Sequence, residues 1–221
     1  MHPVLLVFML GLLAFTAPAV AGSWLREPGE SFMSISSTTR QQNGMRTSET
    51  GFFFERGVSR HFTFGLDVHQ ASTGAGHRLA FVRTPLPWRH PRNRLAFEFA
   101  LGRHTDGHDW YPMQKVTLSY GRPLSTRWGP GWLNMDLARE MRRGSGRIDK
   151  LDLTIGLSTD RKINPMLQIE TARIPGRPLY WAALPGLRLK GRKGTQWVLS
   201  PEVRANPNRS MGLKFALWKE F

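Results

Sequence analysis

Apolar and polar side chains alternate with a period of two residues along most of the chain. Every second residue is apolar in the ranges 61–69, 94–103, 115–120, 133–138 and 150–157. Because neighbouring side chains of a β-strand point to opposite faces, this pattern predicts strands with one apolar face. Apolar stripes with helical spacing are almost absent, so we predict an all-β fold.

The alternation predicts one antiparallel sheet of about twelve strands, and a count of about ten also fits the pattern. The ranges 30–40, 77–85 and 180–190 alternate least clearly. Turn-forming residues such as Gln42-Asn43-Gly44 separate the strands, so neighbours in sequence should pair. The predicted strands are roughly 30–40, 47–56, 60–70, 77–85, 93–103, 112–121, 130–142, 147–158, 162–173, 180–190, 194–204 and 208–221.

The second face of these strands distinguishes a membrane barrel from a soluble sandwich. It carries small residues such as Gly65, Ala96 and Gly156 between acids and bases. Small residues let a sheet close, and opposite charges neutralise one another in a narrow interior. We therefore predict a single up-and-down transmembrane β-barrel with a charged, largely occluded lumen. The predicted lumen charges are Asp67, Glu98, Lys115, Asp136, Lys150, Asp152, Glu170 and Lys214, and His61 and His69 are predicted to be interior hydrogen-bond partners.

Most tryptophans fall in turns or near the ends of predicted strands. In a membrane barrel, aromatic residues at these places form two girdles at the membrane interfaces. A tryptophan cluster in a core is the competing interpretation. The predicted girdle residues are Trp88, Trp110, Trp128, Trp132, Trp181, Trp197 and Trp218, with Tyr111, Tyr120 and Tyr180.

The first 21 residues have the features of a signal peptide, which leaves residues 22–221 for the barrel. Residues 4–20 are almost wholly apolar, and Ala19-Val20-Ala21 fits a cleavage site with small residues. No Lys or Arg precedes the apolar run, so an uncleaved anchor is the alternative. The chain has no cysteine, and its net charge of +15 lies entirely after residue 21. In an exported chain this charge favours lipid phosphates or anionic polysaccharide over nucleic acid.

The chain ends in a long alternating segment, SMGLKFALWKEF, whose last residue is aromatic. This segment resembles the C-terminal assembly signal of Gram-negative outer-membrane β-barrels. The resemblance implies that the last strand is recognised by the barrel assembly machinery. Lys219 departs from the pattern, because the family usually has an apolar residue or Tyr there. The residues that match are Met211, Leu213, Phe215, Leu217 and Phe221.

One loop carries residues that can do chemistry. His104, Asp106 and His108 have a spacing that could converge on a divalent metal, and His with Asp can act as acid and base. Outer-membrane lipid A deacylases have a similar architecture, but the serine of that family has no counterpart here, and Thr105 is the nearest hydroxyl. An ordinary structural loop is the simpler interpretation, because His, Asp and Gly are common in turns.

A basic turn gives a second candidate contact. Arg142, Arg143 and Arg147 could hold lipopolysaccharide phosphates, or form a solvated turn. The leading hypothesis is a non-enzymatic barrel in the outer membrane, either structural or a narrow solute pore, without a cofactor. The alternatives are a lipid-modifying enzyme that uses the His104 loop and a soluble periplasmic β-protein that binds an acidic ligand. The sequence carries no signal for oligomeric state, transported solute or pathway.

Overall fold

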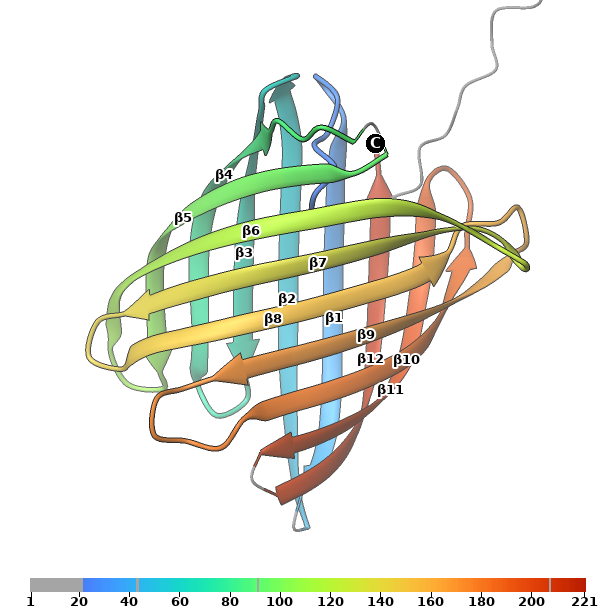
Figure 1. Cartoon of the computed structure of the whole chain (residues 1–221). Coiled ribbons are helices and arrows are strands. Elements are labelled where there is room, and N and C mark those ends of the chain that lie inside the picture. The colour runs from blue at the N-terminus through green and yellow to red at the C-terminus, as the bar shows by residue number, and fades with distance from the viewer. Residues whose placement is uncertain (1–21, 43, 91, 207) are drawn as a thin grey trace, which may run out of the picture.

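The computed structural model describes residues 22–42, 44–90, 92–206 and 208–221, which form a closed barrel of twelve antiparallel strands (Figure 1). The strands are β1 (Ser31–Gln42), β2 (Met45–Ser59), β3 (Phe62–Ala71), β4 (Ala75–Leu86), β5 (Arg94–Asp106), β6 (Trp110–Thr126), β7 (Gly129–Arg142), β8 (Gly146–Leu157), β9 (Ile163–Arg173), β10 (Tyr180–Lys190), β11 (Thr195–Asn206) and β12 (Asn208–Glu220). The predicted fold class is confirmed, including the three strands whose alternation is weakest.

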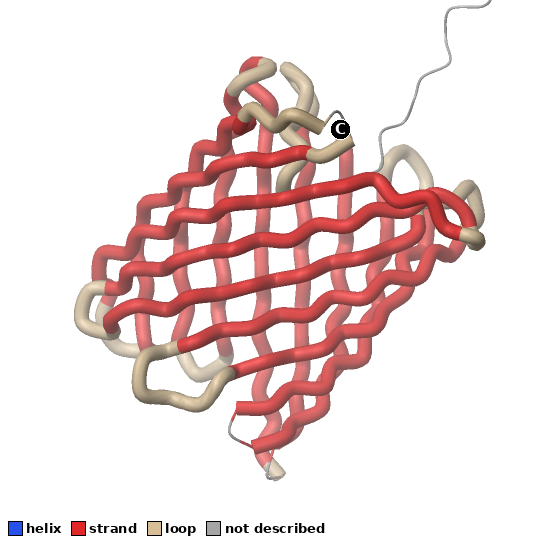
Figure 2. The backbone as a smooth tube through the Cα atoms, in the orientation of Figure 1, coloured by secondary structure: helices blue, strands red, loops and turns tan. Residues whose placement is uncertain are grey.

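Short connections join each strand to the next, and the sheet closes where the first strand meets the last. β1 pairs with β12 in a continuous register from Phe32 opposite Glu220 to Gln41 opposite Met211. The terminal Phe221 extends this ladder, because its backbone carbonyl accepts a bond from the Ser31 N–H at 2.7 Å. Figure 2 shows that strands make up nearly all of the wall. None of the described residues form a helix long and apolar enough to cross a membrane.

The two faces of the wall differ as the alternation predicts. On β3, Phe62, Phe64 and Leu66 are about half exposed on the outer face, whereas Thr63 between them is fully buried inside. Closed strands leave no unpaired edge, and an exposed apolar outer surface suits a bilayer rather than water. The barrel therefore has its polar side chains inside and its apolar side chains outside.

The segment before β1 turns into the barrel at the end where the chain terminates. Ser23 is buried, and its backbone N–H donates to Asn134 Oδ1 at 3.1 Å. Gly121 of β6 makes room for this segment, because a Cβ there would lie 1.8 Å from Ser23 Oγ and 2.3 Å from the Trp24 ring. We call residues 22–26 the inner N-terminal segment. The predicted signal peptide, residues 1–21, lies outside the described residues.

Candidate functional site

The interior of the barrel is the candidate site, and its charges are nearly balanced. Nine bases and ten acids project inward, so the excess positive charge of the chain lies outside the lumen. The interior bases are Arg26, Arg40, Arg83, Lys115, Arg142, Lys150, Arg188, Arg204 and Lys214. The interior acids are Glu49, Glu55, Asp67, Glu98, Asp136, Glu140, Asp152, Glu170, Glu202 and Glu220.

A chain of ion pairs begins at the inner N-terminal segment. Glu55 is fully buried and accepts from Arg26 Nε and Arg83 Nη1, both at 2.6 Å. Arg83 also donates from Nη2 to Glu98 Oε2 at 2.6 Å. Isolated charges at this depth would be costly, and the pairing offsets that cost. The N-terminal segment is thereby fastened to the inner faces of β2 and β4.

The same network continues along the middle of the barrel. Lys115 Nζ lies 2.8 Å from Asp67 Oδ2 and 3.5 Å from Glu98 Oε1. His77 Nε2 lies 3.2 Å from the other oxygen of Asp67. These residues come from strands β3 to β6, so ion pairs connect four adjacent strands along one side of the lumen.

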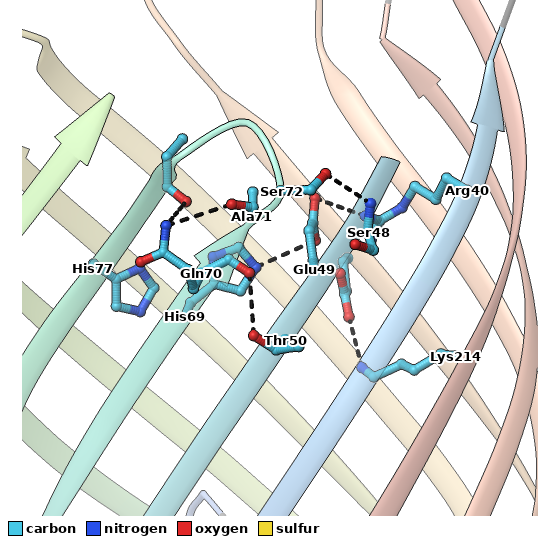
Figure 3. A network of polar contacts seen from close by, with 12 residues as sticks. Arg40, Ser48, Glu49, Thr50, His69, Gln70, Ala71, Ser72, His77 and Lys214 are labelled. Atoms are coloured by element: carbon cyan, nitrogen blue, oxygen red, sulfur yellow. Dashed lines mark hydrogen bonds and ion pairs between the residues drawn. The ribbon is translucent and has the colours of Figure 1, made fainter. Parts of the chain in front are cut away.

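A second network crosses the seam between the first and last strands, at the end opposite the chain termini. Arg40 contacts Glu49 at 2.6 Å and Glu202 at 2.7 Å, and Arg204 also contacts Glu202 at 2.9 Å. His69 Nε2 lies 3.2 Å from Glu49 Oε2 (Figure 3). The contacts link β1, β2, β3 and β11, so they hold the closing strands together inside the lumen.

Between these networks lies a cavity of about 370 Å³ that is lined by side chains of both charges, among them Asp136 and Asp152. Asp136, Asp152 and Glu170 are neighbours across β7, β8 and β9 in one row. Lys214 approaches Glu170 at 3.5 Å, and Asn134 Nδ2 donates to Asp136 Oδ2 at 2.8 Å. The cavity is lined by charged and aromatic side chains and has space for water or a small solute.

An aromatic layer lies inside the lumen near the end where the chain terminates. The Arg188 guanidinium is buried, lying 5.7 Å from the Trp132 ring and 5.9 Å from the Trp218 ring. Phe32 contacts the Trp218 ring edge-on at 6.1 Å. The prediction that Trp132 and Trp218 join the outer girdles is therefore wrong. Both side chains point inward and line the cavity, because strand parity and not distance from a turn decides the face.

The eight predicted lumen charges all project inward and line the interior cavities. They lie in two of these cavities, with Glu170 in a smaller one of about 130 Å³ that also contains Arg40 and Glu49. His69 lies inside, as described above. His61 does not, because it occupies the exposed turn between β2 and β3 after the strand has ended. The prediction for His61 is therefore wrong.

The structure does not bring together the three residues of the proposed metal or catalytic loop. His104 points into the barrel, is buried, and lies 3.1 Å from the Arg143 carbonyl oxygen. Asp106 and His108 are exposed on the rim, where the His108 N–H donates to Asp106 Oδ1 at 3.4 Å. Among the described residues, no group of three or more His, Asp or Glu is arranged to hold a metal ion.

The three arginines of the basic turn also separate. Arg142 points inward and contacts Glu140 at 2.6 Å, Arg143 lies in the turn, and Arg147 is on the outer face beside Asp149 at 3.2 Å. Lys150 also contacts Glu140, at 2.5 Å. Only Arg147 is thus placed on the membrane-facing side of a strand.

The residues of the C-terminal motif share the outer face of β12. Met211, Leu213 and Phe215 are about half exposed or more, and Leu217 lies on the same face. Lys219 shares this face, and its Nζ donates to the Lys193 carbonyl and lies 3.3 Å from Thr195 Oγ1. The lysine that departs from the motif is therefore bound to the β10–β11 turn.

The alternation pattern does not predict several charged residues that face the interior. Glu55 follows a run of three phenylalanines, and Arg83 follows Phe81, which also points inward. On these strands the inner face is partly apolar, so alternation alone does not tell which face is which. Asp67 faces the lumen, and the β2–β3 and β3–β4 registers place Glu55 and Arg83 on the same face as Asp67. Knowledge of the strand pairing would therefore have identified both charges.

No protein-family model matches the chain, and no curated protein matches it. Solved structures do. A KdgM porin has a TM-score of 0.61 at 12% sequence identity, covering 85% of this chain and 99% of the porin. The chain has the fold of porin barrels. A NanC porin gives 0.59 at 8% identity, covering 84% and 98%. LpxR from Salmonella typhimurium gives 0.50 at 6% identity, covering 85% and 99%. At these identities the similarity shows the fold alone.

Proposed function

We propose that the protein is an integral outer-membrane barrel that provides a narrow pathway for small polar solutes and is closed in the conformation described above. One observation carries the proposal. The inner N-terminal segment and the aromatic layer lie inside the mouth where the chain terminates, and together with charged side chains they line a cavity of about 370 Å³. A cavity lined by charged side chains and bordered by a segment outside the sheet suits a solute pathway better than a purely structural barrel.

The balance of interior charges bears on the kind of solute. Acids and bases are nearly equal in number, so the lumen has little field of one sign to concentrate ions. This favours an uncharged or zwitterionic polar solute. A KdgM porin has been solved in complex with disordered oligogalacturonate, so a barrel of this fold accommodates that ligand in that protein.

The location rests on three features. The outer face is apolar, the wall has no unpaired edge, and the final strand carries the motif of outer-membrane barrels. Recognition of that motif by the barrel assembly machinery, and export directed by residues 1–21, belong to the same proposal. The geometry of His104, which faces the interior, offers no support for lipid chemistry at the outer face.

Planar-bilayer recording tests the proposal. The unmodified barrel should show little or no current. Twelve strands with inward charges enclose a narrower lumen than general porins, which have about 16–18 strands. A variant that lacks residues 22–25 but keeps Arg26, and with it the contact to Glu55, should open a larger and steadier current. Large stable steps from the unmodified protein would show that the lumen is open. Absence of current from the shortened variant would favour a structural role.

A further inference from the structure

Three arginines converge on one carboxylate on the outer face of the barrel, near the rim opposite the chain termini. Arg139 of β7, Asp149 of β8 and Arg173 of β9 are direct neighbours in the strand register. Arg139 Nε lies 2.7 Å from Asp149 Oδ1, and Arg147 Nε lies 3.2 Å from Asp149 Oδ2. We call these four residues the outer arginine cluster.

The cluster has more positive charge than its carboxylate can neutralise. Three guanidinium groups against Asp149 leave an excess of two positive charges. Arg139 and Arg147 are each 51% exposed, and exposed ion pairs of this kind contribute little to stability. The arginines can therefore exchange Asp149 for another anion at small cost. A hollow of about 480 Å³ beside them is lined by Arg147, Asp149, Arg173, Pro175 and Gly176.

The surface next to the cluster is apolar. Going from the cluster toward the middle of the barrel, the next rows across β7, β8 and β9 are almost entirely aliphatic. These rows are Leu137, Leu151 and Thr171, then Met135, Leu153 and Ile169, then Leu133, Ile155 and Leu167. The arginines thus lie at the boundary of the apolar belt, where lipid headgroups meet acyl chains.

We infer that Arg139, Arg147 and Arg173 bind the phosphomonoester headgroup of a membrane lipid whose acyl chains lie along the adjoining apolar rows. A phosphomonoester carries about −1.5 to −2 charges near neutral pH, which matches the excess of the cluster better than the single charge of a phosphodiester. The planar forks of arginine also fit phosphate oxygens in pairs. The inference rests on the bilayer location under the proposed function.

Native mass spectrometry of the full chain in detergent tests the inference, with phosphatidic acid as the probe and phosphatidylglycerol of the same acyl chains as the diester. Phosphatidic acid should bind more tightly. The double variant Arg147→Gln/Arg173→Gln should weaken its binding about tenfold or more, since it removes two charged forks. Asp149→Asn should strengthen it, because the competing carboxylate is lost.

The control removes the same charge from the same rim. Arg46 and Arg103 are exposed outside the cluster, so Arg46→Gln/Arg103→Gln should keep the affinity of the unmodified protein. Equal loss in both double variants, or equal affinity for the two lipids, would overturn the inference. Displacement by inorganic phosphate at the affinity of the lipid would assign the site to free phosphate instead.

The test of the lipid site can be separated from the test of the membrane barrel. Each variant is first run on a gel with and without boiling, because a closed barrel migrates faster before it is unfolded. Loss of lipid binding by an Arg147→Gln/Arg173→Gln variant that still shows this shift supports the site, whereas unchanged binding by that folded variant counts against the site alone. Absence of the shift in the unmodified protein would count against the membrane barrel itself.

Discussion

Glu55 and Arg83 contact each other at 2.6 Å across the intervening strand β3, with both side chains almost completely buried. The inward residues of β3 between them are Thr63 and Gly65, and both are small. At Gly65 a Cβ would lie 2.1 Å from the Phe81 ring and 2.3 Å from the Phe54 carbonyl oxygen. Small residues on one strand therefore allow charges on its two neighbours to pair inside the lumen.

Removal of Glu55 should destabilise the barrel strongly. In Glu55→Ala, Arg83 keeps Glu98 and Arg26 keeps Glu220 at 3.2 Å, but both arginines lose the fully buried carboxylate between them and the charges there no longer balance. Breaking a buried pair in this way costs about 3–5 kcal/mol. Guanidinium unfolding of vesicle-reconstituted protein, followed by tryptophan fluorescence, measures the loss. Asp160→Ala in an exposed loop is the control, and equal midpoints for the two variants would contradict the importance of the pair.

A single methyl group at Gly121 should displace the inner N-terminal segment. The Cβ of Gly121→Ala would overlap Ser23 and the Trp24 ring, and the segment is the part best able to move. We expect a rise in planar-bilayer current similar to that of the variant lacking residues 22–25. Gly51→Ala is the control, since its Cβ would meet Ser36 Oγ at 2.7 Å on the inner face of the wall and touches neither the segment nor the aromatic layer. A current that stays at the unmodified level would argue that the segment does not close the lumen.

Strand number and barrel closure could be predicted from the sequence because lipid and lumen impose opposite polarity on alternate residues. β12 illustrates this, since Met211, Leu213, Phe215 and Leu217 all face outward. The inner site could be predicted only where a charge alternates with apolar neighbours, as at Asp67. Glu55 and Arg83 follow inward-facing aromatics, so only the pairing of neighbouring strands reveals their direction.

The wrong predictions for His61 and Trp132 also arise because alternation alone does not fix where a strand begins or which face points inward. His61 fits the alternation of β3, but the strand begins one residue later and leaves it in a turn. Trp132 lies near the start of β7, as a girdle residue would, yet its parity turns it inward toward Arg188. The inner N-terminal segment has no periodic pattern, because its contacts to Asn134 and Glu55 bridge residues far apart in the sequence.

A charged residue on the bilayer-facing side of β12 should destabilise the barrel. Phe215 is 47% exposed on this face, and a charged residue there costs up to about 2–4 kcal/mol, with acids at the lower end. Phe215→Asp should therefore reduce the folded fraction in vesicles, measured as the band that migrates faster without boiling. Ser36→Asp, on the inner face of the neighbouring strand β1, adds the same charge in the cavities that contain Lys214 and should fold normally. The reverse ranking of the two variants would contradict the register.

The last residue should matter for assembly in cells far more than for stability. Phe221 is 60% exposed and adds only one backbone pair with Ser31 and a ring contact with Phe54 at 6.4 Å. We expect Phe221→Ser to refold into vesicles almost like the unmodified protein, because the backbone pair remains. In cells its outer-membrane level should fall strongly, because the aromatic ring of the assembly signal is lost, whereas Phe221→Tyr should keep most of it. Quantitative immunoblots of membrane fractions measure the difference. If Phe221→Ser reached normal levels in cells, the C-terminal ring would not be the signal, and if it also failed to refold in vesicles, its role would be structural.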